Sequence, residues 1–205
     1  MTQKKHPYVI GVTGGVGSGK SCILQILKDK WKAGIFLADD IAHELMEPGG
    51  AGFGPVVEAL GEGILAPDGT IDRKAMAARI FSDTGARETV NGIIHPMVWE
   101  GVRRRIEKAG EDGLSLAVVE AALPDEKNHD IYDEMWYVYT SGENRIRRLM
   151  EGRGYTREKC ESIMASQLPD EAFRRLCTFE IDNNGSLEDA GRQIRERLES
   201  RGLTT

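Results

Sequence analysis

Residues 14–21 of the chain, GGVGSGKS, combine the side chains and the spacing of a phosphate-binding loop. Four residues separate Gly14 from Gly19, and Lys20 and Ser21 follow, which matches the pattern G-x-x-x-x-G-K-[ST]. Glycines let the backbone wrap around an anion without Cβ clashes, so that successive N–H groups can face phosphate oxygens. In such loops the lysine reaches the β- and γ-phosphates, and the hydroxyl group, here that of Ser21, binds Mg²⁺. The pattern predicts a nucleoside triphosphate site. The residues expected to form it are Gly14, Gly15, Val16, Gly17, Ser18, Gly19, Lys20, Ser21 and Cys22.

The segments on either side of this loop are those that phosphate binding requires. YVIGVT, at 8–13, is an apolar run with β-branched residues and predicts a strand. Residues 21–31 predict a helix with Ile23, Ile26 and Leu27 on one face. The loop would therefore end at a helix N-terminus, where backbone N–H groups and the helix dipole favour an anion.

Strand and helix patterns alternate through the rest of the chain. Further strands are expected at 33–40, 114–123, 135–141 and 178–182. Helices are expected at 41–47, 53–64, 72–81, 86–107 (interrupted near His95-Pro96), 143–151, 156–165, 169–176 and, after the cap signal SLED, up to residue 200. With right-handed crossovers, this alternation predicts a three-layer α/β fold whose five-stranded parallel sheet is covered on both faces.

Residues 51–113 have little strand character, and we interpret them as a helical insertion that grips a second substrate. The nucleotide-binding core would then comprise 1–50, 114–140 and 171–205. The segment 141–170 is expected to form a lid.

Carboxylates end two of the predicted strands. Ligands of a parallel sheet bind beyond the carboxyl ends of its strands; the second strand is predicted to end at Asp39-Asp40, and the third runs into Glu120. A carboxylate there could hold a Mg²⁺-bound water or accept a proton from an attacking hydroxyl group. Asp39 or Asp40 could instead cap a helix, and Glu120 could make a structural hydrogen bond. Both interpretations stay open.

The segment 141–159 is rich in arginine. Arg145 and Arg148 are three residues apart and share a helix face, while Ile146, Leu149 and Met150 are expected to be buried. Arginines above the phosphates would neutralise charge on the transferred group, whereas the alternative is a solvated basic face. The five arginines are Arg145, Arg147, Arg148, Arg153 and Arg157.

Composition limits the class of protein. The 205 residues are 40% hydrophobic and carry a formal net charge of −6, which argues against bulk binding to nucleic acid or to an anionic membrane. No apolar stretch approaches the length of a spanning helix, residues 1–5 leave no room for a signal peptide, and the three cysteines form no C-x-x-C, so a cytoplasmic location is expected. No N-K-x-D exists, which disfavours a GTPase and favours a small-molecule kinase.

Taken together, the motifs make the whole chain resemble the dephospho-CoA kinase family. They are GVTGGVGSGKS, LADDIAHELMEPG, ILAPDGTIDRKAMAARIF, IIHPMV, VVEAAL, RIRRLM, IMASQ and IDNNGSLED, in the order and spacing of that family. The resemblance implies that ATP, with Mg²⁺ as cofactor, phosphorylates the ribose 3′-hydroxyl of dephospho-CoA to give CoA. It also implies a P-loop core, a helical CoA domain and a mobile lid.

The resemblance also assigns roles. Asp39 matches the aspartate thought to deprotonate the 3′-hydroxyl, Lys20 the P-loop lysine, and Arg148 an arginine of the lid that acts in catalysis and ATP binding. The substrate side is implied to include Asp39, His43, His95 and Glu120.

The chain departs from the family pattern at several positions. Leu37 stands where many members have aspartate, His43 where arginine is frequent, and Gly152 where a second lid arginine is usual. Many members have Pro-Leu-Leu where this chain has Ala-Leu-Pro124, and Cys177-Thr178 also differs. Two other hypotheses stay open: a kinase for another small molecule or nucleoside monophosphate, and a nucleotide-binding regulatory module without catalysis. ATP and dephospho-CoA are the expected partners of a monomer or weak homo-oligomer.

Overall fold

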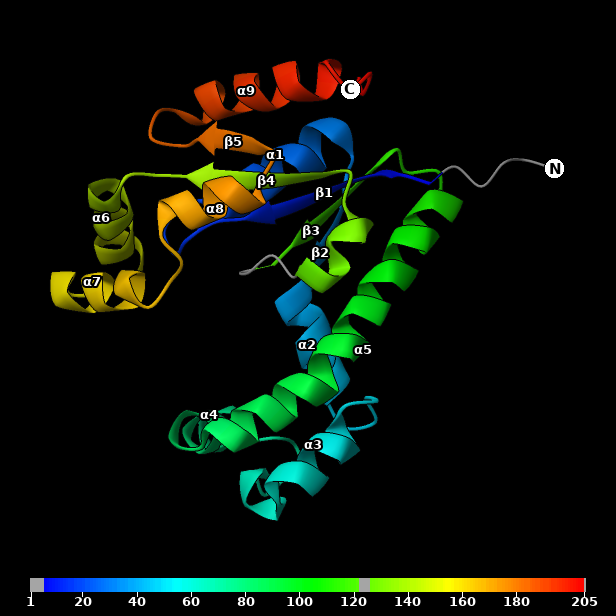
Figure 1. Cartoon of the computed structure of the whole chain (residues 1–205), viewed down its shortest axis with the longest axis vertical. Coiled ribbons are helices and arrows are strands. Elements are labelled where there is room, and N and C mark those ends of the chain that lie inside the picture. The colour runs from blue at the N-terminus through cyan, green and yellow to red at the C-terminus, as the bar shows by residue number, and fades with distance from the viewer. Residues whose placement is uncertain (1–5, 122–125, 205) are drawn as a thin grey trace. The chain divides into compact units, whose positions relative to one another are not determined.

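The computed structural model describes residues 6–121 and 126–204, and these form two compact units. The first unit comprises the described residues up to Ile35 and from Ile106 onward, and the second is Phe36–Arg105. Figure 1 shows the sheet with α1 and α6 to α9 in the first unit, and helices α2 to α4 in the second.

A five-stranded sheet in the order β2-β3-β1-β4-β5 forms the centre of the first unit. Strand β1 pairs in parallel with β3 and β4, and β4 pairs in parallel with β5, which confirms the predicted α/β fold. The central position of β1 places the loop that follows it in the middle of the carboxyl edge of the sheet. The strands are β1 (Tyr8–Thr13), β2 (Gly34–Leu37), β3 (Leu116–Glu120), β4 (Glu134–Tyr139) and β5 (Phe179–Asp182).

Helices cover both faces of this sheet, as the contacts of two successive residues of β4 show, since successive side chains of a strand point to opposite sides. Trp136 packs edge-on against Phe179 with ring centroids 5.2 Å apart, and Arg197 of α9 lies over the same Phe179 ring. Tyr137 points the other way and stacks on Phe173 of α8 at 5.0 Å. The helices of this unit are α1 (Lys20–Trp31), α6 (Gly142–Arg153), α7 (Arg157–Ala165), α8 (Asp170–Leu176) and α9 (Leu187–Glu199), with the 3₁₀ helix η2 (Glu126–Ile131).

The second unit is helical and has its own apolar core. Ile41, Val56 and Ile94 are buried in it, and a Cβ on Gly52 would crowd the Ile94 side chain, so the start of α3 approaches α5 closely. An ion pair between Glu44 and Arg105 ties α2 to α5. The elements are α2 (Ala38–Met46), α3 (Phe53–Leu60), η1 (Glu62–Ile64), α4 (Arg73–Ser82) and α5 (Thr84–Glu111), which continues into the first unit.

Three local predictions were wrong. Strand β2 ends at Leu37, so Asp39 and Asp40 begin a helix instead of ending a strand. Helix α5 continues through Pro96, because the buried side chains on both sides of it, such as Ile94 and Val98, keep packing although one backbone hydrogen bond is lost. The side chain of Met150 is exposed instead of buried.

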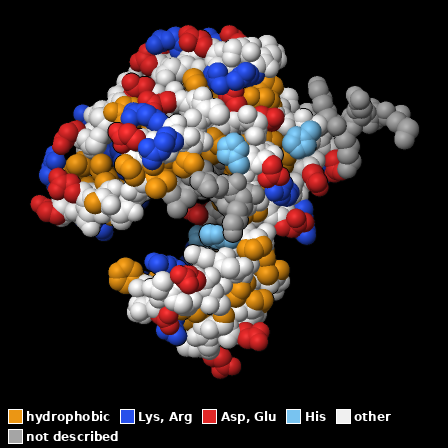
Figure 2. Space-filling model, in the orientation of Figure 1, with side chains coloured by type: hydrophobic (Ala, Val, Ile, Leu, Met, Phe, Trp, Pro, Cys, Tyr) orange, Lys and Arg blue, Asp and Glu red, His pale blue; other side chains and the backbone are white. Residues whose placement is uncertain are grey.

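The predicted start of the last helix is confirmed. Ser186 caps α9, and Asp189 completes a capping box with it. No helix in the described ranges combines the length and apolar character that crossing a bilayer requires. On the face seen in Figure 2, basic and acidic side chains are interspersed over each unit.

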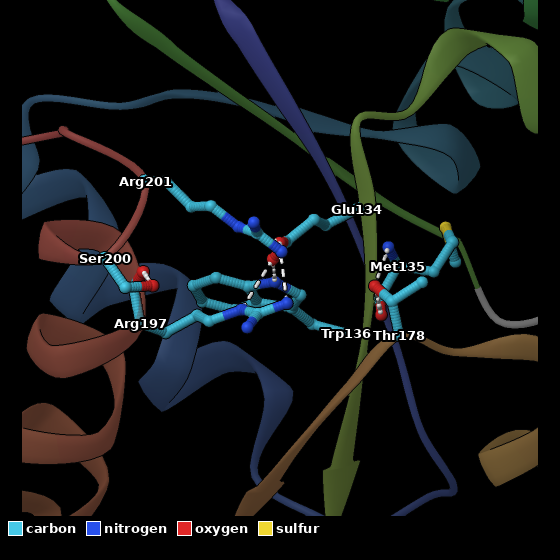
Figure 3. Close-up of polar contacts among 7 residues, drawn as sticks. All are labelled: Glu134, Met135, Trp136, Thr178, Arg197, Ser200 and Arg201. Carbon is cyan, nitrogen blue, oxygen red and sulfur yellow. Dashed lines mark hydrogen bonds and ion pairs between the residues drawn. The ribbon is translucent and has the colours of Figure 1, made fainter.

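A buried carboxylate joins the end of the chain to the sheet (Figure 3). Glu134, at the start of β4, has only 3% of its side chain exposed. It accepts hydrogen bonds from Trp136 Nε1 at 2.7 Å, from Arg197 Nη2 at 2.7 Å and from Arg201 Nε at 2.6 Å. The two arginines come from the last turn of α9 and the residues after it. This cluster therefore fixes α9 against the amino end of the sheet.

We predict that Glu134 makes the fold sensitive to acid. Burial disfavours its charged form, but the hydrogen bonds from Trp136, Arg197 and Arg201 outweigh burial and lower the pKa of Glu134. Because the pKa of Glu134 is lower in the folded protein than in the unfolded chain, its ionised form stabilises the fold at pH values above the ordinary glutamate pKa. This stabilisation is lost as the pH falls through the pKa that Glu134 has in the folded protein. Glu134→Gln should therefore reduce stability near pH 7 while flattening the loss of stability below about pH 4.5, the range where a free glutamate titrates.

Urea unfolding of both proteins across pH 3–7 measures this effect. Glu134→Ala should cost about 3 kcal/mol, because it leaves two arginines without their carboxylate. If the free energy of unfolding fell equally steeply below about pH 4.5 in the wild type and in Glu134→Gln, other carboxylates would control acid unfolding.

Candidate active site

The loop between β1 and α1 has a conformation that depends on glycine. Gly17 and Gly19 have φ angles of 77° and 89°, in the left-handed region that other residues rarely adopt. A Cβ on Gly19 would collide with the Nδ2 atom of Asn183, and one on Gly17 would lie 3.0 Å from the carbonyl oxygen of Arg145. Glycine is therefore required at both positions, by conformation and by close packing.

Several backbone amides of this loop are available to an anion. Val16 N–H donates to Gln167 Oε1 and Ser18 N–H to the Gly15 carbonyl oxygen. By contrast, within the described part of the chain, no acceptor meets the amides at the end of the loop and the start of α1. These free amides belong to Gly17, Gly19, Lys20 and Ser21. Consecutive unpaired N–H groups at a helix N-terminus form the cradle that phosphate groups bind.

Lys20 lies over the loop that precedes it. Its Nζ atom donates to the Gly14 carbonyl oxygen at 2.8 Å and lies 3.5 Å from Glu120 Oε1. Both side chains are less than one fifth exposed. The structure thus brings together the P-loop lysine and the carboxylate that ends β3, as expected for two residues at one edge of a parallel sheet.

The carbonyl oxygen of Ser18 accepts three hydrogen bonds. The donors are Thr140 Oγ1 at 2.9 Å, Asn183 Nδ2 at 2.7 Å and Arg148 Nη1 at 3.2 Å. Arg148 Nη2 also donates to the Asn183 carbonyl oxygen at 2.7 Å. Arg148 therefore lies beside the loop. The sequence reasoning missed Thr140 and Asn183, although each directly follows a strand, β4 or β5, at the carboxyl edge where ligands bind.

The other arginines of α6 and α7 separate into two environments. Arg145 is buried and contacts the loop, and burial lowers the pKa of its guanidinium. Arg157 is instead held at the surface by Glu143 at 2.8 Å and Glu161 at 3.4 Å, and Arg147 and Arg153 are exposed. Arg147, Arg153 and Arg157 thus form the solvated basic surface that was the alternative interpretation. Arg145 and Arg148 share the helix face that contacts the loop.

The residues expected on the acceptor side belong mainly to the second unit. Asp39 and Asp40 are exposed in the first turn of α2, whose N-cap is Leu37 without a side-chain cap hydrogen bond. Neither aspartate is therefore the cap of this helix. His43 lies in the last turn of α2, and His95 is exposed on α5 beside Pro96. Glu120 is the exception, because it lies in the first unit beside Lys20.

The donor set suits a magnesium ion carried mainly by a nucleotide. Among the described residues, no group of three or more His, Cys, Asp and Glu side chains could hold a metal. Mg²⁺ commonly uses one or two protein oxygens together with phosphate oxygens and waters. Ser21 supplies an exposed hydroxyl group in the first turn of α1, beside the free amides.

Comparison with known proteins identifies the family of the chain. A family model described as dephospho-CoA kinase matches residues 8–189. The chain belongs to the dephospho-CoA kinase family. The dephospho-CoA kinase of Geobacter sulfurreducens is 40% identical over 189 residues, which cover 92% of this chain and 95% of the relative. The family assignment makes this chain an enzyme, an ATP-dependent kinase.

Solved structures agree with this dephospho-CoA kinase assignment at the level of fold. A crystal structure of a Thermus thermophilus protein superposes with a TM-score of 0.79 at 29% identity, covering 96% of this chain and 98% of that chain. A dephospho-CoA kinase from Campylobacter jejuni gives a TM-score of 0.69 at 19% identity, covering 95% and 98%, which shows a shared fold.

The structure also locates the departures from the family pattern. Leu37 is half-buried at the end of β2, so its position is the last one before α2. Gly152 is exposed near the end of α6, where a Cβ would meet no atom within 4 Å. Cys177 follows α8, and burial raises the pKa of its thiol to about 12. Pro124 lies outside the described residues.

We predict that Gly19→Ala will weaken nucleotide binding. The added Cβ would strain a residue with positive φ and displace Asn183 from Ser18, which costs about 1–3 kcal/mol and disturbs the cradle. Isothermal titration with ATP should give a dissociation constant at least about tenfold higher.

Gly154→Ala is the matched control for this substitution. Gly154 also has a positive φ, 63°, but a Cβ there would meet no atom within 4 Å. This variant should lose some stability, measured by urea unfolding, and keep the ATP affinity of the wild type. Equal ATP affinities for all three proteins would contradict the assigned loop geometry.

Proposed function

We propose that this protein transfers the γ-phosphoryl group of ATP to the ribose 3′-hydroxyl of dephospho-CoA, giving CoA and ADP. The observation that carries the proposal is the match of residues 8–189 to the dephospho-CoA kinase family in a chain whose phosphate loop is intact. The free amides at the end of this loop, together with Lys20, supply the donors that a triphosphate needs.

On the nucleotide side, the loop amides would hold the β- and γ-phosphates and Lys20 would offset their charge. The Lys20 ammonium, 2.8 Å from the Gly14 carbonyl oxygen, lies over the loop and within reach of phosphates bound there. The 3.5 Å pairing with Glu120 supports a role for Glu120 in holding Lys20, in addition to its predicted contact with the substrate. Ser21 would bind Mg²⁺, which when present would supply positive charge that offsets the negative charge of the phosphates.

On the acceptor side, Asp39 would orient the 3′-hydroxyl group and accept its proton. The hydroxyl oxygen forms a bond to the γ-phosphorus, and the bond from phosphorus to the β,γ-bridging oxygen breaks as ADP leaves. The exposed position of Asp39, two residues after β2, supports this role, since substrates of parallel sheets bind beyond the strand ends. Arg148 would add positive charge beside Ser18 during transfer.

The other predicted assignments belong to the same proposal. The helical insertion 51–113 would grip the CoA moiety with His95, while His43 would lie on the substrate side, and 141–170 would act as the lid. ATP and dephospho-CoA are the proposed partners. The cytoplasmic location, and the monomer or weak homo-oligomer, stay predictions from the sequence.

An assay that couples ADP release to a detectable signal tests the activity. ATP is offered with dephospho-CoA, with AMP, or without an acceptor. We expect rapid turnover only in the sample that contains both ATP and dephospho-CoA. Without an acceptor, ATP hydrolysis should be slow, because a closed site keeps water from the γ-phosphate. Turnover with AMP only would indicate a nucleoside monophosphate kinase, and no turnover with ATP still bound would indicate a regulatory module.

We predict that Asp39→Asn will lower kcat by about 10²–10⁴-fold while leaving the Kd for ATP near that of the wild type. The amide keeps the shape of the side chain but cannot take the hydroxyl proton. Asp40→Asn, a change to the neighbouring carboxylate, is the matched comparison and should retain most activity. If Asp40→Asn were the damaging change, the proton acceptor would be Asp40.

We also predict that Lys20→Ala will abolish most turnover and raise the Kd for ATP. It removes the ammonium group that lies over the loop. Kinetics and isothermal titration together check this, and unchanged kcat/KM for ATP would refute the assignment of the phosphate loop.

A further inference from the structure

Val16, in the middle of the phosphate loop, is held by two side chains that come from the segment 141–170. Gln167 Oε1 accepts a hydrogen bond from Val16 N–H at 3.1 Å, and Arg145 Nε donates to the Val16 carbonyl oxygen at 2.8 Å. Arg145 Nη2 also donates to Gln167 Oε1 at 2.7 Å. Both backbone groups of one loop residue are therefore fixed by a connected pair of side chains.

These contacts determine where the next amide points. In a trans peptide, the carbonyl group and the following N–H group point in opposite directions, and the described residues contain no cis peptide. Because the Val16 carbonyl faces Arg145, the Gly17 N–H points away from α6. Arg148 faces the Ser18 carbonyl in the same way, which directs the Gly19 N–H. Both amides are among those free to meet an anion.

Arg145 is also a buried charge whose electrostatic partner Asp170 acts on it without a direct ion pair. It is 6% exposed, and among the described residues it forms no ion pair, since its hydrogen bonds go to neutral oxygens of Val16 and Gln167. A Cβ on Gly15 would collide with the guanidinium group, so the cation packs directly against the loop. A buried cation of this kind is costly by itself, and an anion bound in the loop would offset that cost.

We propose that Arg145 and Gln167 are positioning residues for the nucleotide: they orient the peptide between Val16 and Gly17, and Arg145 places a positive charge behind it. A hydrogen bond donated to the carbonyl oxygen also polarises the peptide, which makes the Gly17 N–H a stronger donor. This inference rests on the proposed ATP-dependent function. It concerns ATP binding alone, so it can be tested without the phosphoryl acceptor.

The test measures Kd for ATP by isothermal titration in the absence of an acceptor. Arg145→Gln and Gln167→Ala should each raise Kd about 10- to 100-fold, the expected effect of losing one charge-assisted hydrogen bond. The double variant should be little worse than either single variant, since both act on Val16. Arg157→Ala is the matched control and should stay within about twofold of the wild type, because it removes an exposed ion pair.

The variant Gln167→Glu distinguishes whether Arg145 and Gln167 position the loop for the nucleotide or only stabilise the fold. The carboxylate keeps the acceptor for Val16 N–H and pairs with Arg145, so the fold should be as stable as the wild type in urea. It also cancels the charge of Arg145 behind the loop. We therefore expect weaker ATP binding without loss of stability, whereas a purely structural role predicts unchanged binding.

Steady-state kinetics provide a second readout. In Arg145→Gln, KM for ATP should rise while KM for dephospho-CoA stays within about twofold of the wild type. A folded Arg145→Gln protein with the wild-type Kd for ATP would overturn the inference, as would normal ATP binding by Gln167→Glu. If Arg145→Gln does not fold, the two Gln167 variants decide. A wild type that binds ATP but leaves dephospho-CoA unmodified would refute the proposed function, and the comparison of Kd values would still test this pair.

Discussion

The carbonyl oxygen of Ser18 ties the phosphate loop to the rest of the sheet. Its three donors are Thr140 after β4, Arg148 on α6 and Asn183 after β5. A glycine-rich loop has few side chains with which to fix its own shape, and its backbone loses much conformational entropy on ordering. The conformation of the loop is therefore fixed by residues outside it, whose side chains donate hydrogen bonds to the Ser18 carbonyl oxygen. Because carbonyl and amide point in opposite directions, the same contacts leave the Gly19 amide free for phosphate.

Two buried charged side chains near the ends of β4 illustrate different uses of charge. Glu134, at the start of the strand, meets two arginines and Trp136, so its charge is compensated and the cluster holds α9 in place. Arg145, in the helix after the strand, meets only neutral oxygens. Asp170 attracts this guanidinium without a direct ion pair. A buried cation beside free loop amides is the arrangement expected of an anion-binding site, since a bound anion would add a close counter-charge.

The second unit gives the proposed acceptor side its own support. Ile41 anchors α2 in a core shared with α3 and α5, and the ion pair of Glu44 with Arg105 holds the same helix. Asp39 and Asp40 occupy the first turn of α2, where carboxylates favour helix formation through the helix dipole. Their presence thus has a local structural reason. Both carboxylates are exposed, and neither is engaged as the cap of the helix.

The sequence alone determined the phosphate loop, the α/β fold and the family, because these depend on local patterns: glycine spacing, hydrophobic periodicity and the order of motifs. It also placed Arg145 and Arg148 on one helix face, and it located the cap at Ser186. It did not decide which of five arginines meets the loop, since that depends on how α6 packs. Arg145 and Val16 are 129 residues apart, and Asn183 and Ser18 are 165 apart. The continuity of α5 through Pro96 and the end of β2 at Leu37 were likewise decided by tertiary packing. Such contacts arise only when the carboxyl ends of β1, β4 and β5 come together, and no pattern of neighbouring residues encodes that meeting.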